Sequence, residues 1–423
     1  MNYYSTNNKF EKACFKQAVI NGLASDRGLY MPEIIPVLSD AILNRKRIDI
    51  HEIGYEISKQ FIGDEINSNR LQDIISESLN FIIPVLPLSE NIFALELFHG
   101  PTLAFKDVGA RFMARVLSYF HENEKKEITI LTATSGDTGS AVANGFYNVE
   151  GINVVILYPS KGVSELQEKQ MTTLGKNIQA IEINGTFDDC QRLVKQAFGD
   201  TELKKKLQFT SANSINIARL IPQSFYYLQA YSMVKEKEAV LFSVPSGNFG
   251  NITAGLLAKK MGINACFIAA TNANKVVHDF LESGKFISKN SIKTISNAMD
   301  VGNTRNFMRI LSLYNNSLEK IQKDIEGFSL SDDETKNTMK KVYSEKKYML
   351  DPHSAIAYSA LERKNKSGVF LATAHPAKFK DVVEETLQTK ISLPDQLKQV
   401  AKKEKSAVFM SADFKSLKDY LLK

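Results

Sequence analysis

The feature that most constrains the fold is a repeated alternation of short apolar runs with helical segments. Each run ends in a loop of Gly, Ser, Thr or Pro, and the clearest runs are residues 128–132, 154–158, 239–244, 266–269 and 368–372. Strands that are apolar on both faces and alternate with helices indicate parallel sheets covered on both sides. Ligands bind beyond the carboxyl ends of such strands, so function is expected in the loops that follow these runs.

Bulk composition excludes several classes of protein. The chain has 423 residues and 43% apolar residues, which is enough for two or more cores. Residues 1–6 lack the charged and apolar parts of a signal peptide, and no apolar run is long enough to span a bilayer. We therefore expect a soluble globular protein in the cytoplasm, without a membrane partner.

Cysteine and charge patterns also disfavour other kinds of site. Cys14, Cys190 and Cys266 are far apart and odd in number, so neither a disulfide framework nor a metal site is indicated. The net charge of +6 is spread over runs of mixed sign, which are typical of solvated helix faces. Nucleic acid is therefore not expected as a partner.

The first 92 residues predict a mostly helical region that carries no evident chemistry. Helical spacing relates Phe10, Cys14, Ala18 and Val19, and a turn follows at 26–28. The strand pattern begins after this region.

A lysine among apolar residues precedes a helical run at 108–120. The stretch 97–107 places Lys106 directly after Leu103, Ala104 and Phe105. Burial lowers the pKa of a lysine and leaves free amine that can form a Schiff base with a carbonyl. A lysine whose stem covers apolar surface while its ammonium stays in water explains the same pattern. The other loops decide between these interpretations.

Two loops have the composition of anion-binding sites. The 245–251 loop follows a strand, precedes a helix at 252–261, and combines two glycines with the side chains of Ser246, Asn248 and Asn251. Inward N–H groups and a helix amino terminus suit a phosphate monoester, and the loop has neither the P-loop nor the dinucleotide motif. The 132–140 loop precedes a helix at 141–147 and is dense in hydroxyls, as a carboxylate site requires. The last strand ends near Thr373, which by itself is explained by a turn cap.

These stretches together resemble the threonine synthase family of bacteria and fungi, pyridoxal-phosphate enzymes with the fold of the tryptophan synthase β-subunit. The resemblance covers nearly the whole chain. The matching segments are 4–6, 22–24, 98–107, 135–139, 213–216, 246–251, 296–303, 351–355 and 373–379. Departures are Arg27, where many members have glycine, and Thr304-Arg305, where Pro-Ser is frequent.

The resemblance implies a fold and a division of the chain. The expected class is α/β, with two open, mostly parallel sheets flanked by helices, as in fold type II pyridoxal-phosphate enzymes, and a largely helical N-terminal region. The implied parts are residues 1–92, a smaller α/β domain at 93–222 with the lysine and the 132–140 loop, and a larger α/β domain at 223–423 with the 245–251 loop.

The resemblance also implies the roles of site residues. Lys106 is expected to form the Schiff base with pyridoxal 5′-phosphate and to act as base and acid. The other cofactor contacts are expected to be Asp137, Ser246, Gly247, Asn248, Phe249, Gly250, Asn251 and Thr373. Thr373 would meet the pyridine nitrogen, where a hydroxyl tempers the electron sink. Asp137 would lie near the phenolic oxygen, which favours a protonated or proton-sharing carboxyl.

The implied substrate is O-phospho-L-homoserine, converted with water to L-threonine and phosphate in the last step of threonine biosynthesis. Its expected contacts are Thr134, Ser135, Gly136, Thr138, Asn213, Asn216 and Arg219. A threonine or serine dehydratase of the same fold needs the same lysine and loops but no site for a substrate phosphate. A non-catalytic metabolite-binding protein would use the loops without the Schiff base. The chain is expected to be a monomer or a small homo-oligomer.

Overall fold

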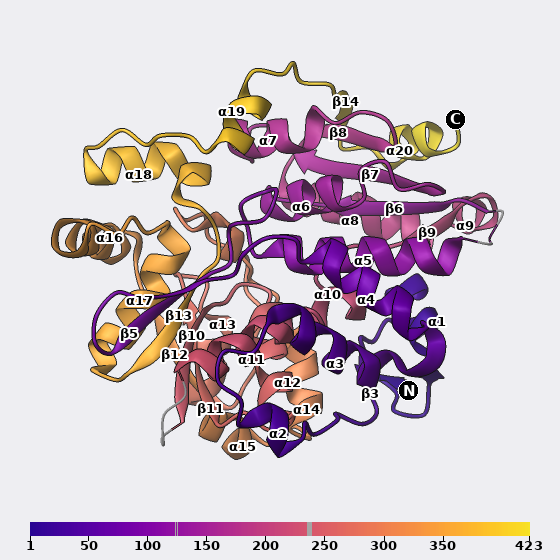
Figure 1. The fold of residues 1–423 in the computed structure, drawn as a ribbon. Helices are drawn as coiled ribbons and strands as arrows, with labels where there is room; N and C mark the ends of the chain where they lie inside the picture. The colour runs from indigo at the N-terminus through magenta and orange to yellow at the C-terminus, as the bar shows by residue number, and fades with distance from the viewer. Residues whose placement is uncertain (123, 125, 235–238) are drawn as a thin grey trace.

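Two mostly parallel sheets form the framework of the protein (Figure 1). The computed structural model describes residues 1–122, 124, 126–234 and 239–423. One sheet has six strands in the order β12-β11-β10-β13-β5-β4, and the other has five in the order β14-β8-β7-β6-β9. All neighbours in both sheets are parallel except β4 and β5.

The strand bounds agree with the apolar runs of the sequence. The six-stranded sheet contains β4 (Val85–Pro87), β5 (Ile92–Glu96), β10 (Val240–Pro245), β11 (Ala265–Thr271), β12 (Ile325–Ser329) and β13 (Gly368–Ala372). The five-stranded sheet contains β6 (Ile128–Ala133), β7 (Ile152–Pro159), β8 (Ile178–Asn184), β9 (Gln208–Thr210) and β14 (Val408–Ser411). The predicted α/β class with two mainly parallel sheets is confirmed.

Alternate side chains of the central strands enter different cores, which explains why these strands are apolar on both faces. In β6, Ile130 joins the core that contains Phe112 of helix α5 (Lys106–His121), whereas Leu131 joins the core that contains Leu193 of helix α8 (Phe187–Gly199). In β13, Leu371 joins the same core as Ile130, whereas Phe370 joins another core on the opposite face. Helices therefore cover both faces of each sheet.

The helices are short and often begin at a side-chain cap. Asp49, Thr186, Ser331 and Asp351 accept backbone N–H groups at four helix starts. The first helices are α1 (Phe15–Asn21), α2 (Asp40–Leu43), α3 (Ile50–Ile62), α4 (Ser68–Ser78), α5 (Lys106–His121), α6 (Asp137–Gly145), α7 (Glu165–Thr172), α8 (Phe187–Gly199), α9 (Thr201–Lys206) and α10 (Ile217–Leu220). The later ones are α11 (Gln223–Val234), α12 (Gly250–Lys260), α13 (Val276–Ser283), α14 (Phe307–Leu313), α15 (Leu318–Asp324), α16 (Asp332–Lys346), α17 (Pro352–Lys364), α18 (Lys380–Leu387), α19 (Asp395–Ala401) and α20 (Phe414–Leu421). Three 3-10 helices are η1 (Gly63–Glu65), η2 (Asn297–Met299) and η3 (Pro376–Phe379).

The N-terminal region differs in part from the helical prediction. Helices α1 to α4 are present, but a small antiparallel sheet of β1 (Tyr3–Ser5), β2 (Lys12–Ala13) and β3 (Tyr30–Pro32) precedes and follows α1. The helical spacing assigned to Phe10 is wrong, because Phe10 is 93% exposed and α1 begins only at Phe15. Ala18 and Val19 are buried as the spacing predicts.

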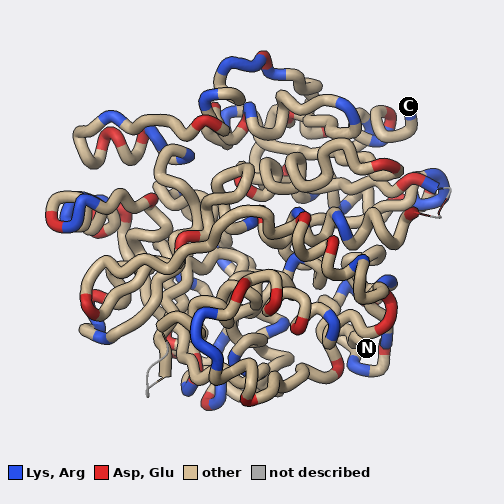
Figure 2. Tube along the Cα trace, in the orientation of Figure 1, with Lys and Arg blue, Asp and Glu red and all other residues tan. Residues whose placement is uncertain are grey.

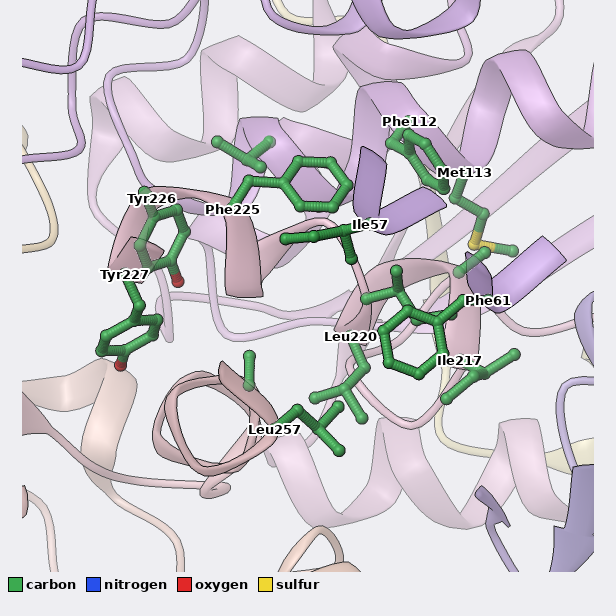
Figure 3. Close-up of a cluster of buried hydrophobic side chains, with 14 of the residues drawn as sticks. Ile57, Phe61, Phe112, Met113, Ile217, Leu220, Phe225, Tyr226, Tyr227 and Leu257 are labelled. Atoms are coloured by element: carbon green, nitrogen blue, oxygen red, sulfur yellow. The ribbon is translucent and has the colours of Figure 1, made fainter. Parts of the chain in front are cut away.

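A large apolar cluster lies between the helix that begins at Lys106 and the helix that follows the 245–251 loop (Figure 3). Side chains from α3, α5, α10, α11 and α12 meet there, and the labelled residues are Ile57, Phe61, Phe112, Met113, Ile217, Leu220, Phe225, Tyr226, Tyr227 and Leu257. Helix α5 begins at Lys106 and α12 begins in the 245–251 loop. The cluster therefore packs the lysine helix and the phosphate-binding candidate against the same core.

The predicted domain boundaries at residues 92 and 222 stay a prediction. Each sheet contains strands from more than one of the predicted parts of the chain. Strand β5 lies in the sheet that contains β10, and β14, near the C-terminus, pairs with β8 of the other sheet. Within the described residues no helix has the length and apolar character to cross a membrane. Figure 2 shows basic and acidic residues interspersed along the chain.

Candidate active site

Lys106 and Thr373 lie together because their strands are parallel neighbours. Strands β5 and β13 end in register at Glu96 and Ala372, so both chains leave the sheet at one edge. The segments then stay paired: the Phe105 N–H donates to the Thr373 carbonyl at 2.9 Å, and the His375 N–H donates to the Leu103 carbonyl at 3.0 Å. The sequence analysis expects function beyond the carboxyl ends of strands, and both segments lie beyond such an end.

The Lys106 amine is enclosed at the start of α5. Its Nζ lies 3.5 Å from Asp137 Oδ2 and 4.8 Å from the centre of the Phe105 ring, and the side chain is 16% exposed. Burial lowers the pKa of Lys106; Asp137 opposes this effect, and the nearby charges of Lys378 and Arg219 add to it. A fraction of neutral amine is therefore favoured, as the Schiff-base interpretation requires.

Asp137 lies between two lysines at the start of α6. Its Oδ1 is 2.8 Å from Lys378 Nζ and accepts a 2.9 Å hydrogen bond from Gln167 Nε2, while Oδ2 faces Lys106. Burial alone raises the pKa of this carboxyl, but the Lys378 and Lys106 ammonium groups outweigh it and hold the pKa well below its usual range. With these partners Asp137 is a carboxylate, whereas the state predicted beside a phenolate stays a prediction.

The 245–251 loop presents backbone donors that have no acceptor among the described residues. An added Cβ at Gly247 would lie 2.7 Å from Met299 Cα, so only glycine allows this close approach. Phe249 takes a left-handed conformation with φ of 60° and brings the chain into α12. The N–H groups of residues 247–249 have no acceptor in the described part of the chain, and they precede an eleven-residue helix.

Asn251 is a buried residue of this loop whose side-chain amide N–H group has no acceptor among the residues that the structure describes. Its Oδ1 accepts from the hydroxyls of Tyr226 and Tyr227, both at 2.7 Å, while its Nδ2 is buried without a partner. A buried unpaired donor is costly unless a ligand accepts from it. Ser246 has a different role at present, because its hydroxyl donates to the Val244 carbonyl at 2.8 Å.

A second layer fixes the 245–251 loop in place. Asn248 donates to Ser214 Oγ at 2.8 Å and accepts from the Arg305 N–H at 2.7 Å. The segment that contacts Gly247 is held by His353, whose Nε2 accepts from the Ala298 N–H at 3.2 Å while its Nδ1 lies 2.7 Å from Asp351. His353 therefore helps to hold the segment that lies against Gly247.

The hydroxyls of the 132–140 loop have two roles. One supports the loop, and two others have no partner among the described residues. Thr134 Oγ1 accepts from the N–H groups of Gly136 and Gly139 at 3.0 and 2.8 Å, so it shapes the loop. Gly136 has φ of 134° and an added Cβ would lie 2.6 Å from Gln167. Ser135 and Thr138 are half-buried, and their hydroxyls have no hydrogen-bond partner among the described residues. These two hydroxyls and the start of α6 are suited to an anion such as a carboxylate.

Asn213, Asn216 and Arg219, three of the expected substrate contacts, differ in their surroundings. Asn213 is half-buried and accepts from Thr132 Oγ1 at 2.6 Å. Asn216 is fully buried; its Nδ2 donates to the carbonyls of Val19 and Ser211 and its Oδ1 caps α10, so its amide has an internal role. Arg219 is 2% exposed, with Nη1 donating to the Ala212 carbonyl and Nε buried without a partner.

Thr373 is 6% exposed, and its hydroxyl has no partner in the part of the chain that the structure describes. A neutral hydroxyl is thus available beside Lys106, at the edge shared by β5 and β13. The candidate site thus combines a phosphate-type loop after β10, a hydroxyl-rich loop after β6 and the enclosed Lys106 amine. This donor set fits pyridoxal phosphate, which carries a phosphate, an aldehyde and a ring nitrogen.

Comparisons with known proteins show the family of the chain. A family model described as pyridoxal-phosphate dependent enzyme matches residues 83–371, and models for the N terminus and the C-terminal part of threonine synthase match residues 2–79 and 354–421. A threonine synthase of Haemophilus influenzae is 46% identical over 429 residues, which is 100% of both chains. The chain belongs to the threonine synthase family.

Solved structures of this family have the same fold throughout. The crystal structure of threonine synthase from Escherichia coli has a TM-score of 0.93 at 43% identity, covering 100% of this chain and 99% of that one. The pyridoxal-phosphate-bound threonine synthase from Brucella melitensis has a TM-score of 0.94 at 34% identity, covering 100% and 98%. The predicted family, fold type and pyridoxal-phosphate cofactor are confirmed, and the chain is an enzyme rather than a non-catalytic binding protein.

Two residues at the candidate site of this threonine synthase family member, Lys378 and Gln167, were not predicted from the sequence. Both contact Asp137 at hydrogen-bond distance. The signal for Lys378 was present: like Lys106 it follows a strand end and lies among apolar residues, Ala377 and Phe379. For Gln167 there was no such signal, because its contact depends on how α7 packs against α6.

Proposed function

We propose that the protein converts O-phospho-L-homoserine and water to L-threonine and inorganic phosphate, with Lys106 as the proton-transferring residue. The observation that carries the proposal is the enclosed Lys106 amine, 3.5 Å from Asp137, at the edge where β5 and β13 end. The names of its full-length relatives support the same product. A dehydratase would need no extra cation for a substrate phosphate, whereas this chain has a buried arginine near Lys106.

The residues present would hold the cofactor and substrate as follows. The backbone N–H groups of 247–251 and the Asn251 amide would bind the cofactor phosphate, and Thr373 would meet the pyridine nitrogen. Pyridoxal phosphate, when bound, supplies an electron sink for negative charge that develops on the substrate carbons. Ser135, Thr138 and the first N–H groups of α6 would bind the substrate carboxylate.

Lys106 would move the protons of the reaction. As a neutral amine it would take the proton from Cα, pass that proton to the cofactor and so become neutral again, and then take one from Cβ, and phosphate would leave from Cγ. It would give a proton to Cγ, take one from the water that adds at Cβ, and return the Cα proton to complete L-threonine. One residue can serve as both base and acid because its pKa is lowered by burial toward the working range. Asp137 stays charged near it and limits how far that pKa falls.

Replacing Lys106 with Ala is expected to abolish formation of threonine and phosphate, because the amine that tethers and transfers protons is lost. The fold should survive, since the side chain makes a single 3.5 Å ion pair. Phosphate release and amino-acid analysis on the purified variants give the measurement, with circular dichroism as the check on folding. Lys106→Arg is the matched control: it keeps the positive charge but cannot become neutral, so it should be inactive too. Near-normal threonine formation by either variant would contradict the proposal.

A further inference from the structure

A second buried lysine shares the carboxylate that faces Lys106. The side chain of Lys378 is 0% exposed, and its Nζ is 2.8 Å from Asp137 Oδ1, closer than Lys106 is to Oδ2 at 3.5 Å. We propose that Lys378 is a positioning residue: it holds one oxygen of Asp137, turns the other toward Lys106, and thereby keeps the Lys106 amine available as a neutral base. This inference rests on the proposed function of Lys106.

Contacts from several elements fix Lys378 and Asp137 in this orientation. Lys378 belongs to η3, which follows β13, and its Nζ also donates to the Thr102 carbonyl at 2.7 Å. Thr102 is itself held by the buried Asp107, which accepts from the Thr102 N–H at 2.8 Å. From α7, Gln167 adds a second donor to Asp137 Oδ1. Oδ1 is therefore occupied by two donors, and Oδ2 is left for Lys106.

The charges around Lys106 explain how Lys378 affects the protonation of the Lys106 amine. The charged groups that face Lys106 are Asp137 on α6, Lys378 on η3 and Arg219 on α10, so one carboxylate is opposed by two further cations. If Lys378 were absent, Asp137 would pair with Lys106 alone and would stabilise its ammonium form. A buried carboxylate left with one cation pairs strongly with it, because the surrounding protein screens charge weakly.

Lys378 also faces groups outside this trio. Its charge acts on Asp107 and on the partly buried His375, and His375 in turn faces His99 and Glu96. Burial is the main cause that lowers the pKa of His375. These groups are not among the charges that shift the pKa of Lys106, so a change at Lys378 should reach Lys106 through Asp137 and through the charge of Lys378 itself.

The test measures the protonation of Lys106 directly. The full chain without added cofactor is labelled with acetic anhydride across a pH series, and peptide mass spectrometry follows Lys106, which reacts only when neutral. Lys378→Met is expected to raise the labelling midpoint of Lys106 by about one pH unit or more, and Asp137→Asn is expected to lower it. Lys380→Met is the matched control, because it removes a cation two residues away that has no contact with Asp137.

In the holoenzyme the same change should appear in the pH profile. Because the neutral amine is the active form, a higher Lys106 pKa moves the acidic limb of kcat to higher pH in Lys378→Met. An unmoved or lowered midpoint in Lys378→Met would overturn the inference, since a purely structural lysine would change stability but not Lys106. If Lys378→Met does not fold, Asp137→Asn decides: a lowered midpoint supports the coupling, and an unmoved or raised one overturns it. Labelling needs no turnover, so failure to make threonine would count against the proposed function alone.

Discussion

Arg219 is the residue that would distinguish a phosphorylated substrate from an unphosphorylated one. Its guanidinium lies under the first turn of α5, where an added Cβ at Gly109 would be 3.0 Å from Nε. Burial lowers its pKa to about 10, and Asp107 opposes that change from a distance beyond hydrogen bonding. A buried cation without a bonded carboxylate is unfavourable unless an anion joins it. We propose that this anion is the phosphate of O-phospho-L-homoserine, with Asn213 as a second donor.

Replacing Arg219 with Met should weaken the use of O-phospho-L-homoserine by about 2–5 kcal/mol, roughly 30-fold to several thousand-fold in kcat/KM. The affinity for L-threonine, which has no phosphate, should change little. This affinity is measured from the visible spectrum of the holoenzyme. Arg309→Met is the matched control, because Arg309 is equally buried but donates to the carbonyls of Tyr30 and Ile215 and to Asn306. Equal losses for substrate and product in Arg219→Met would mean that Arg219 supports the fold instead.

One departure from the family pattern also has a local explanation. Arg27 adopts a left-handed backbone with φ of 67° in the turn between Ala24 and Gly28. Glycine takes this conformation without steric cost, so its frequent use at this position follows from backbone geometry. The turn does not contact the site residues described above, and the departure bears on stability rather than activity.

At the scale of elements, the strand–loop–helix unit from β10 to α12 decides how tightly a phosphate is held. Gly247→Ala places a methyl group 2.7 Å from Met299 Cα and 2.9 Å from the Ala298 carbonyl, both backbone atoms. The loop must shift, and overpacking of this kind costs about 1–3 kcal/mol. The dissociation constant of pyridoxal phosphate, measured by fluorescence or visible titration, should rise by about 5-fold to 100-fold.

Gly250→Ala on the same loop serves as the control for that experiment. Its added Cβ would lie 3.3 Å from Asn306 Nδ2, the end of a side chain, and the position is the first residue of α12. The cofactor affinity of this variant should stay within a few-fold of the wild type. Equal affinities of the two variants would show that the close approach at Gly247 is unimportant for phosphate binding.

The sequence predicted elements well where burial is continuous. Strands β6, β7, β10 and β13 have buried side chains along nearly their whole length, so their apolar runs are distinct. Strand β14 has only Met410 buried, and no such run identifies it. Phe10 misled the helical interpretation because an exposed aromatic residue happens to have the right spacing. Edge strands and exposed apolar side chains are therefore where pattern reasoning fails.

The same limit applies to the site. Thr373 and the two loops could be singled out because each follows an apolar run at the carboxyl edge of a sheet, and Lys106 because it follows apolar residues. The sharing of Asp137 between Lys106 and Lys378 was not, because it depends on how η3, after β13, meets α6 of the other sheet. Asn216 has a suitable side chain for a ligand, but its contacts with Val19 and Ser211 occupy it internally. Spacing alone carries no information on such contacts.

At the scale of the whole molecule, the residues of the candidate site come from segments that follow strands of both sheets. The 132–140 loop comes from the five-stranded sheet, whereas Thr373 and the 245–251 loop come from the six-stranded sheet. Lys106 follows β5 of the six-stranded sheet, but its helix α5 packs against α6 beside the five-stranded one. The ion pairs of Asp137 with Lys106 and Lys378 therefore connect groups from both sheets.

The central claim is that Lys106, and not its buried neighbour Lys378, is the amine that reacts with the cofactor. The most direct test reduces the wild-type protein, loaded with pyridoxal phosphate, with borohydride and locates the bound cofactor by peptide mass spectrometry. We expect a single reduced adduct on the peptide that contains Lys106, with Lys378 unmodified. An adduct on Lys378, or reduction that leaves no cofactor on Lys106, would contradict it.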